Sequence, residues 1–125
     1  MSARLTAVER TERELTEAVF QRQVTDLAEL LGWSWCHWRA LRNGRGIWQV
    51  PVEGPLGKGW PDLTLVHADQ RRLVFAELKR ELEPVQPHQE LIHAVLRAAG
   101  SEVHVWRPSD LRDPIDLSLI YLTLR

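Results

Sequence analysis

The chain has 125 residues, of which 44% are hydrophobic and 26% are charged, a composition that fits a single globular domain over residues 1–125 and excludes a disordered or collagen-like chain. The single Cys36 cannot form an intramolecular disulfide, and no stretch approaches the roughly 18 apolar residues of a membrane span, so we expect a cytoplasmic protein without membrane association. The net charge of −1 argues against indiscriminate nucleic-acid binding, but the segment from Arg39 to Lys58 carries four basic residues against one acidic residue.

The first predicted element is a helix over residues 11–31, followed by Gly32. Its apolar residues share one face at helical spacing: Phe20, Val24, Leu27, Ala28 and Leu31. At about 100° per residue, Glu17 lies on the same face, whereas Glu14, Asp26 and Glu29 lie outside it. We therefore expect the carboxylate of Glu17 to point towards the core.

A strand is predicted over residues 33–38, and a long segment rich in glycine follows it. The apolar runs 61–67 and 72–79 flank residues 68–71 and predict a β-hairpin. A second amphipathic helix follows residues 84–87, with Pro87 in its first turn and Gly100 beyond its end, and residues 102–106 form the last predicted strand.

The order strand, helix, strand predicts a right-handed crossover, so the last strand should run parallel to a strand of the hairpin in a mixed sheet covered by helices. Residues 115–124 leave two alternatives open. Alternation of apolar residues favours a short strand, whereas the spacing of Leu117, Ile120, Tyr121 and Leu124 favours a helix.

The hairpin places acidic residues opposite each other. If its turn is centred between Asp69 and Gln70, Asp62 faces Glu77 at a Cβ distance of roughly 5 Å, and alternation puts Lys79 on the face of Glu77. Two carboxylates in apolar surroundings repel each other unless a cation lies between them. Oxygen ligands without His or Cys suit Mg²⁺ or Mn²⁺, and the alternative is an exposed pair of strand ends without a metal.

Two short segments place acidic residues and a lysine at a defined spacing. Pro61-Asp62 is followed, fifteen positions after the aspartate, by Glu77-Leu78-Lys79, which is the PD…ExK pattern of the PD-(D/E)XK phosphodiesterase superfamily. Within it, the chain resembles the VRR-NUC (virus-type replication and repair nuclease) family over most of its length. The resemblance rests on residues 17–21, 43–44, 59–63 and 75–79, on Gln89, and on residues 99–100 and 103–110.

This resemblance implies an α/β PD-(D/E)XK nuclease fold, with an αβββαβ core whose mixed sheet is flanked by helices. It also implies a metal site formed by Asp62, Glu77 and the backbone carbonyl of Leu78, with Glu17 as the first-helix acid that completes or supports it. Lys79 is then expected to orient or deprotonate the attacking water, and Gln89 to lie over the site. The chain departs from the family pattern at Ile92, where an aromatic residue is usual.

The implied function is a Mg²⁺- or Mn²⁺-dependent DNA endonuclease of a bacterium or phage that selects DNA structure, such as a four-way (Holliday) junction. The basic residues expected to bind DNA are Arg39, Arg42, Arg45 and Lys58. Two symmetric incisions would require a homodimer, formed through the acidic first helix or the apolar tail. The alternative is a catalytically idle module of the same fold that binds nucleic acid or an antagonised host protein.

Five of the six tryptophans fall into two predicted groups. We expect Trp33, Trp35 and Trp106 in the core, whereas Trp48 and Trp60, in or beside the glycine-rich segment, can reach nucleic acid. The five histidines are scattered along the chain, and no two of them have the i, i+4 spacing of a metal-binding pair on a helix.

Overall fold

The computed structural model describes residues 6–38, 41–42, 44–46, 48–49 and 53–125. Its helices are α1 (Ala7–Leu30), α2 (Pro87–Ala98) and α3 (Leu119–Leu124). The strands are β1 (Ser34–His37), β2 (Leu41–Arg42), β3 (Trp48–Gln49), β4 (Leu63–His67), β5 (Arg72–Leu78) and β6 (Glu102–Trp106). Short 3₁₀ turns span Gly57–Gly59, Pro108–Asp110 and Ile115–Leu117.

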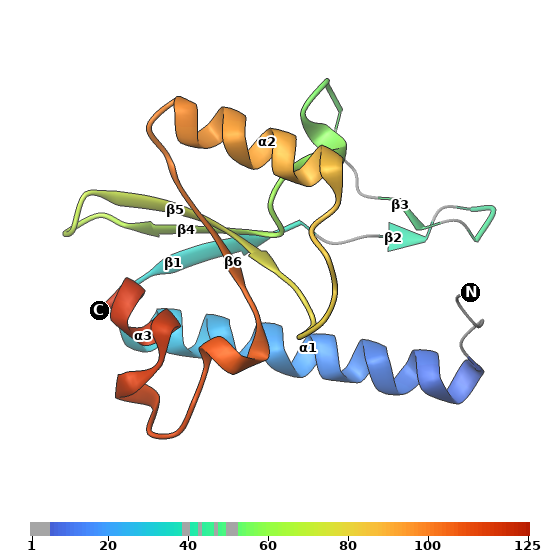
Figure 1. The fold of residues 1–125 in the computed structure, drawn as a ribbon, viewed down its shortest axis with the longest axis horizontal. Coiled ribbons are helices and arrows are strands. Elements are labelled where there is room, and N and C mark those ends of the chain that lie inside the picture. Colours follow the sequence, from blue (N-terminus) through green and yellow to red (C-terminus); the bar gives the residue numbers. More distant parts are fainter. Residues whose placement is uncertain (1–5, 39–40, 43, 47, 50–52) are drawn as a thin grey trace.

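The main sheet has the strand order β1-β4-β5-β6, in which only the β5–β6 pair is parallel. β2 and β3 form a separate two-stranded ribbon between β1 and β4 in the chain (Figure 1). The order α1, β1, β4, β5, α2, β6 gives the predicted αβββαβ core with a mixed sheet, an α/β arrangement compatible with the PD-(D/E)XK nuclease fold.

Helices cover both faces of the sheet (Figure 1). α1 and α3 pack on one face around Leu65, Val74 and Trp106, whereas α2 packs on the other against Phe75 and Val103. Because side chains alternate along β5, Glu77 shares the face of Phe75 and points towards α2. The fold therefore places Glu77 in a layer between the sheet and a helix, away from solvent.

The predicted hairpin register is confirmed. Leu63 pairs with Ala76 and His67 pairs with Arg72, which places the turn at residues 68–71 and puts Asp62 beside Glu77 at the open end of the hairpin. α2 begins at Pro87 and ends before Gly100, and β6 covers residues 102–106, as predicted.

α1 begins four residues earlier than predicted. The side chain of Thr6 accepts a hydrogen bond from the backbone N–H of Glu9, and the Glu9 carboxylate accepts one from the N–H of Thr6, so a capping box starts the helix. At the other end, Gly32 has φ +90°, and a Cβ there would lie 2.9 Å from Nε2 of His67. A glycine is required at this position for both conformation and space.

The tail is helical, which decides between the two alternatives for residues 115–124. Ile120 and Leu124 of α3 are fully buried against α1, and the indole N–H of Trp33 donates a hydrogen bond to the carbonyl of Leu124 at 2.7 Å. The tail therefore completes the core on this face of the sheet. Among the described residues, no helix is both long and apolar enough to cross a lipid bilayer.

Candidate active site

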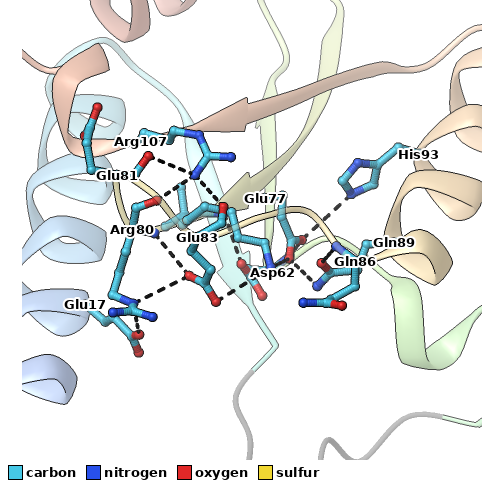
Figure 2. A network of polar contacts seen from close by, with 12 residues as sticks. Glu17, Asp62, Glu77, Arg80, Glu81, Glu83, Gln86, Gln89, His93 and Arg107 are labelled. Atoms are coloured by element: carbon cyan, nitrogen blue, oxygen red, sulfur yellow. Dashed lines mark hydrogen bonds and ion pairs between the residues drawn. The ribbon is translucent and has the colours of Figure 1, made fainter. Parts of the chain in front are cut away.

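Asp62 and Glu77 are held by hydrogen bonds exchanged between neighbouring strands (Figure 2). The N–H of Leu78 donates to Oδ2 of Asp62 at 3.0 Å, and the N–H of Asp62 donates to Oε2 of Glu77 at 3.3 Å. Glu77 is 2% exposed and Asp62 is half-buried. The hairpin register thus holds one oxygen of each carboxylate through the backbone of the opposite strand.

α2 supplies two side chains to Glu77. Nε2 of Gln89 donates to Oε1 of Glu77 at 2.8 Å, while the backbone N–H of Gln86 fixes the amide oxygen of Gln89 at 2.9 Å. His93, one helical turn beyond Gln89, is also buried, and its Nε2 lies 3.9 Å from Oε2 of Glu77. The sequence analysis missed His93, although its i, i+4 spacing from Gln89 is a signal that both share one helix face.

Lys79 is buried at the same place. Its Nζ lies 3.8 Å from Oε1 of Glu77 and 3.9 Å from Oε2 of Glu83. The predicted convergence of two acids and a lysine is present in the fold, and Glu83 adds a further carboxylate beside the lysine.

Burial disfavours the charged forms of both carboxyl groups of the acid pair. Burial is the main cause that raises the pKa of Asp62 to about 6 and the pKa of Glu77 to about 8, and the charge of Asp62 raises that of Glu77 further. Lys79 opposes both shifts but does not cancel them. A cation between the carboxylates would remove this penalty, and the oxygen ligands present suit a hard divalent ion.

Comparison with known families is consistent with this geometry, since residues 53–110 match the model of the VRR-NUC domain. Over this segment the chain is similar to the VRR-NUC family. A search of curated proteins gave no match. The matched segment includes Asp62, Glu77, Lys79 and Gln89, whereas Glu17 and the arginines of residues 39–45 lie before it.

Glu17 does not point into the core, so that prediction is wrong. Its side chain is 46% exposed, and its Oε1 lies 3.4 Å from Nε of Arg80, just beyond β5. Residues 16–19 are all exposed, and the buried face of α1 begins only at Phe20. Glu17 lies on the face of α1 that is turned towards the sheet, but the core does not extend to this turn of the helix.

Among the described residues, no group of three or more His, Cys, Asp or Glu side chains is arranged to hold a metal ion. Asp62 and Glu77 form a pair, and Glu17 is held by Arg80 instead of joining them. The role of Glu17 as a metal ligand therefore stays a prediction.

Arg107 organises the loop that follows β5. Its Nη1 donates to the carbonyl oxygens of Arg80 and Glu83, both at 2.6 Å (Figure 2). The Asp110 carboxylate accepts a hydrogen bond from the N–H of Arg107. The N–H of Ser109 donates to the Glu81 carboxylate. The Arg107–Asp110 segment, which carried the resemblance without an assigned role, thus fixes the loop that brings Glu83 to Lys79.

Three of the predicted DNA-binding residues lie among the described residues: Arg42 in β2, Arg45 between β2 and β3, and Lys58 in the turn Gly57–Gly59. Arg45 and Lys58 are exposed, whereas Arg39 and the side chain of Arg42 fall outside the described residues. Among the described contacts, none joins these basic residues to Asp62 or Glu77.

Of the three tryptophans predicted in the core, two are buried. Trp33 and Trp106 are buried, but Trp35 is 38% exposed, so its predicted core position is wrong. β1 is an edge strand, and the polar part of α1 beside it leaves the Trp35 indole to donate a hydrogen bond to Glu29 at 2.9 Å. Trp60 is half-buried, and the side chain of Trp48 lies outside the described residues.

Proposed function

We propose that the chain is a divalent-metal-dependent DNA endonuclease that hydrolyses phosphodiester bonds in branched DNA and leaves 3′-hydroxyl and 5′-phosphate ends. The observation that carries this proposal is the buried pair of Asp62 and Glu77, each held by the backbone of the opposite strand, with Lys79 beside them. The VRR-NUC domain supports nuclease chemistry at this place.

The acid pair fits a hard divalent ion. The carboxylates of Asp62 and Glu77 and the carbonyl of Leu78 would hold Mg²⁺ or Mn²⁺, because buried oxygens with raised pKa values gain most from a nearby positive charge. Such an ion supplies positive charge against the charge that develops on the phosphoryl group and makes the attacking water more acidic.

The other residues prepare the site. Gln89 fixes the orientation of the Glu77 carboxylate through its hydrogen bond to Oε1. Lys79, at the same oxygen, is placed to orient the attacking water and to stabilise the negative phosphate, with Glu83 on its other side. Arg107 acts at a distance, because it holds the loop that carries Glu83.

A cleavage assay tests the proposed activity. Linear duplex, flap and four-way DNA are incubated with Mg²⁺, with Mn²⁺ and with a chelator. We expect incision of the four-way or flap DNA with either metal and none with the chelator. Metal-independent cleavage would contradict the proposed site, and binding without cleavage under all conditions would favour the catalytically idle module.

We further propose a homodimer that makes paired nicks. Four apolar residues of the tail stay exposed while its other face completes the core: Ile115, Leu117, Leu119 and Leu122. Exposed apolar residues that cluster in this way favour an interface, and a two-fold dimer places two sites for symmetric incisions.

Replacing Leu117 and Leu119 together by glutamate should convert the dimer to a monomer in light scattering and uncouple the two nicks on a four-way junction. Replacing the exposed Leu82 by glutamate is the matched control and should change neither property. A wild-type monomer that nicks both strands independently would refute the paired-cut proposal while leaving the nuclease proposal intact.

The basic residues give a prediction about salt dependence. Neutralising Arg42, Arg45 and Lys58 together should weaken DNA binding and reduce the slope of log affinity against log salt by up to about 0.9 for each lost phosphate contact. Three exposed arginines elsewhere, Arg71, Arg112 and Arg125, provide the charge-matched control. An unchanged slope in the first variant would place the DNA-binding surface elsewhere.

A further inference from the structure

A hollow lined by two tryptophans lies beside the acid pair. It has a volume of about 380 Å³, and its walls are Trp38, Trp60 and the turn over residues 53–57. Glu53 is the one charged residue among those that line it. Volumes of this size are within the range of pockets that bind small organic groups.

The backbone connects this hollow to Asp62. The N–H of Trp38 donates a hydrogen bond to the carbonyl of Asp62 at 2.9 Å, and Trp60 precedes Asp62 by two residues. Both aromatic walls are therefore connected through the backbone to a residue that the proposed function assigns to the metal site.

Contacts with the sheet and with α2 fix one wall of the hollow. The Trp60 ring stands edge-on to Phe75 of β5, with centroids 5.3 Å apart and planes at 79°. The turn at Gly57–Gly59 packs so closely on α2 that a Cβ on Gly59 would lie 2.7 Å from the carbonyl oxygen of His88. In contrast, Trp38 is 40% exposed and presents its ring to solvent.

We propose that this hollow binds one unpaired nucleobase of the nucleotide next to the scissile phosphate, an inference that rests on the proposed nuclease function. A nucleobase has the flat apolar faces that stack on tryptophan and the polar edge that can donate to the Glu53 carboxylate. Its phosphate would lie towards Asp62, and the exposed Lys58 on the neighbouring turn adds positive charge on the same side.

The proposal also explains why such an enzyme selects a DNA structure. A base stacked and paired within a duplex cannot enter the hollow unless it is first extruded, which costs free energy. A nucleotide at a branch point or in a flap is already unpaired, so it enters at lower cost. Substrate selection would thus depend on access of a single base to Trp38 and Trp60, in addition to recognition of the backbone.

Binding without divalent ions tests the hollow separately from cleavage. A mixed-sequence single-stranded oligonucleotide is compared by fluorescence anisotropy with an abasic oligonucleotide of the same length. The wild-type protein should bind the base-containing strand roughly tenfold more tightly. Trp38→Ala should lose most of this difference, whereas Trp35→Ala, which removes an exposed tryptophan outside the hollow, should keep it.

Trp60 contacts Phe75, so Trp60→Ala can unfold the protein. Trp60→Leu, checked by thermal melting, is therefore the second variant. It should also lose the preference for the base-containing strand. In a cleavage assay, a series of substrates carries one abasic site at successive positions across the cut. For the wild type, the abasic site should slow incision at one position next to the cut, whereas the tryptophan variants should show no such position. If the wild type cleaves DNA and no abasic position changes the rate of incision, base binding in the hollow is refuted and the nuclease proposal stands. If it discriminates base from abasic strands but cleaves nothing, the hollow stands and the nuclease proposal fails.

Discussion

Asp62→Asn and Glu77→Gln should each reduce the rate of DNA cleavage by more than roughly a hundredfold. Replacing a residue that only hydrogen-bonds to a metal ligand costs up to about a hundredfold, and we expect the loss of a ligand itself to cost more. Each substitution removes a carboxylate charge from the pair but keeps its size. Asp62→Asn keeps an oxygen that can accept from the N–H of Leu78, whereas Glu77→Gln keeps one oxygen acceptor for the two donors of Glu77, Gln89 and the N–H of Asp62. Incision of four-way DNA in saturating Mn²⁺ measures the effect.

Asp69→Asn is the matched control for these two variants, because it makes the same chemical change at the exposed hairpin turn. It should leave the rate unchanged. Full activity in either Asp62→Asn or Glu77→Gln would remove that carboxylate from the proposed metal site.

The same substitutions should stabilise the metal-free protein at high pH. The raised pKa values mean that the folded state binds protons at Asp62 and Glu77 more tightly than the unfolded chain does. Their contribution to stability is therefore greatest below about pH 4 and is lost as the pH rises through about 6 for Asp62 and about 8 for Glu77.

Thermal melting measures this effect. In a chelator, Glu77→Gln should melt at least about 3 °C above the wild type at a pH near 9, and the two should converge near pH 4. Addition of Mn²⁺ should raise the melting temperature of the wild type but not that of the variant, since a ligand stabilises only a state that binds it. If the stability of the wild type increases between pH 5 and pH 8 relative to that of Glu77→Gln, the raised pKa of Glu77 is contradicted.

Lys79→Arg should be nearly as inactive as Lys79→Met. Lys79 is 6% exposed and its ammonium group lies between Glu77 and Glu83, so the larger planar guanidinium cannot take the same position. Arginine also holds its proton too tightly to accept one from water. Single-turnover cleavage of four-way DNA at saturating enzyme separates this loss from weaker binding.

The comparison with Lys58 makes this prediction specific. Lys58 is exposed on the turn after the ribbon, and it is the only other lysine of the chain. Lys58→Arg should retain DNA binding, because a phosphate contact needs the positive charge and not the amine. Retained cleavage in a folded Lys79→Arg protein would reduce Lys79 to a charge-neutralising role.

The sequence alone determined the hairpin and what it brings together. Alternation of side chains in two short runs, with a four-residue turn, fixed the register that sets Asp62 beside Glu77. Pro87 and Gly100 bounded α2, and the crossover rule predicted that β6 runs parallel to β5. These features follow from the sequence because they depend on local periodicity, on turn residues and on chain connectivity.

Only the tertiary structure decided which residues surround the acid pair. Helical spacing placed Glu17 on the correct side of α1, but the extent of the core, which begins at Phe20, left it exposed to pair with Arg80. The tail is a helix because Ile120 and Leu124 are buried against α1, although its pattern fits a strand equally well. Likewise, the contacts of His93 with Glu77 and of Arg107 with the loop after β5 join segments far apart in the chain. Such contacts depend on how the elements pack together, and local periodicity carries no information about that.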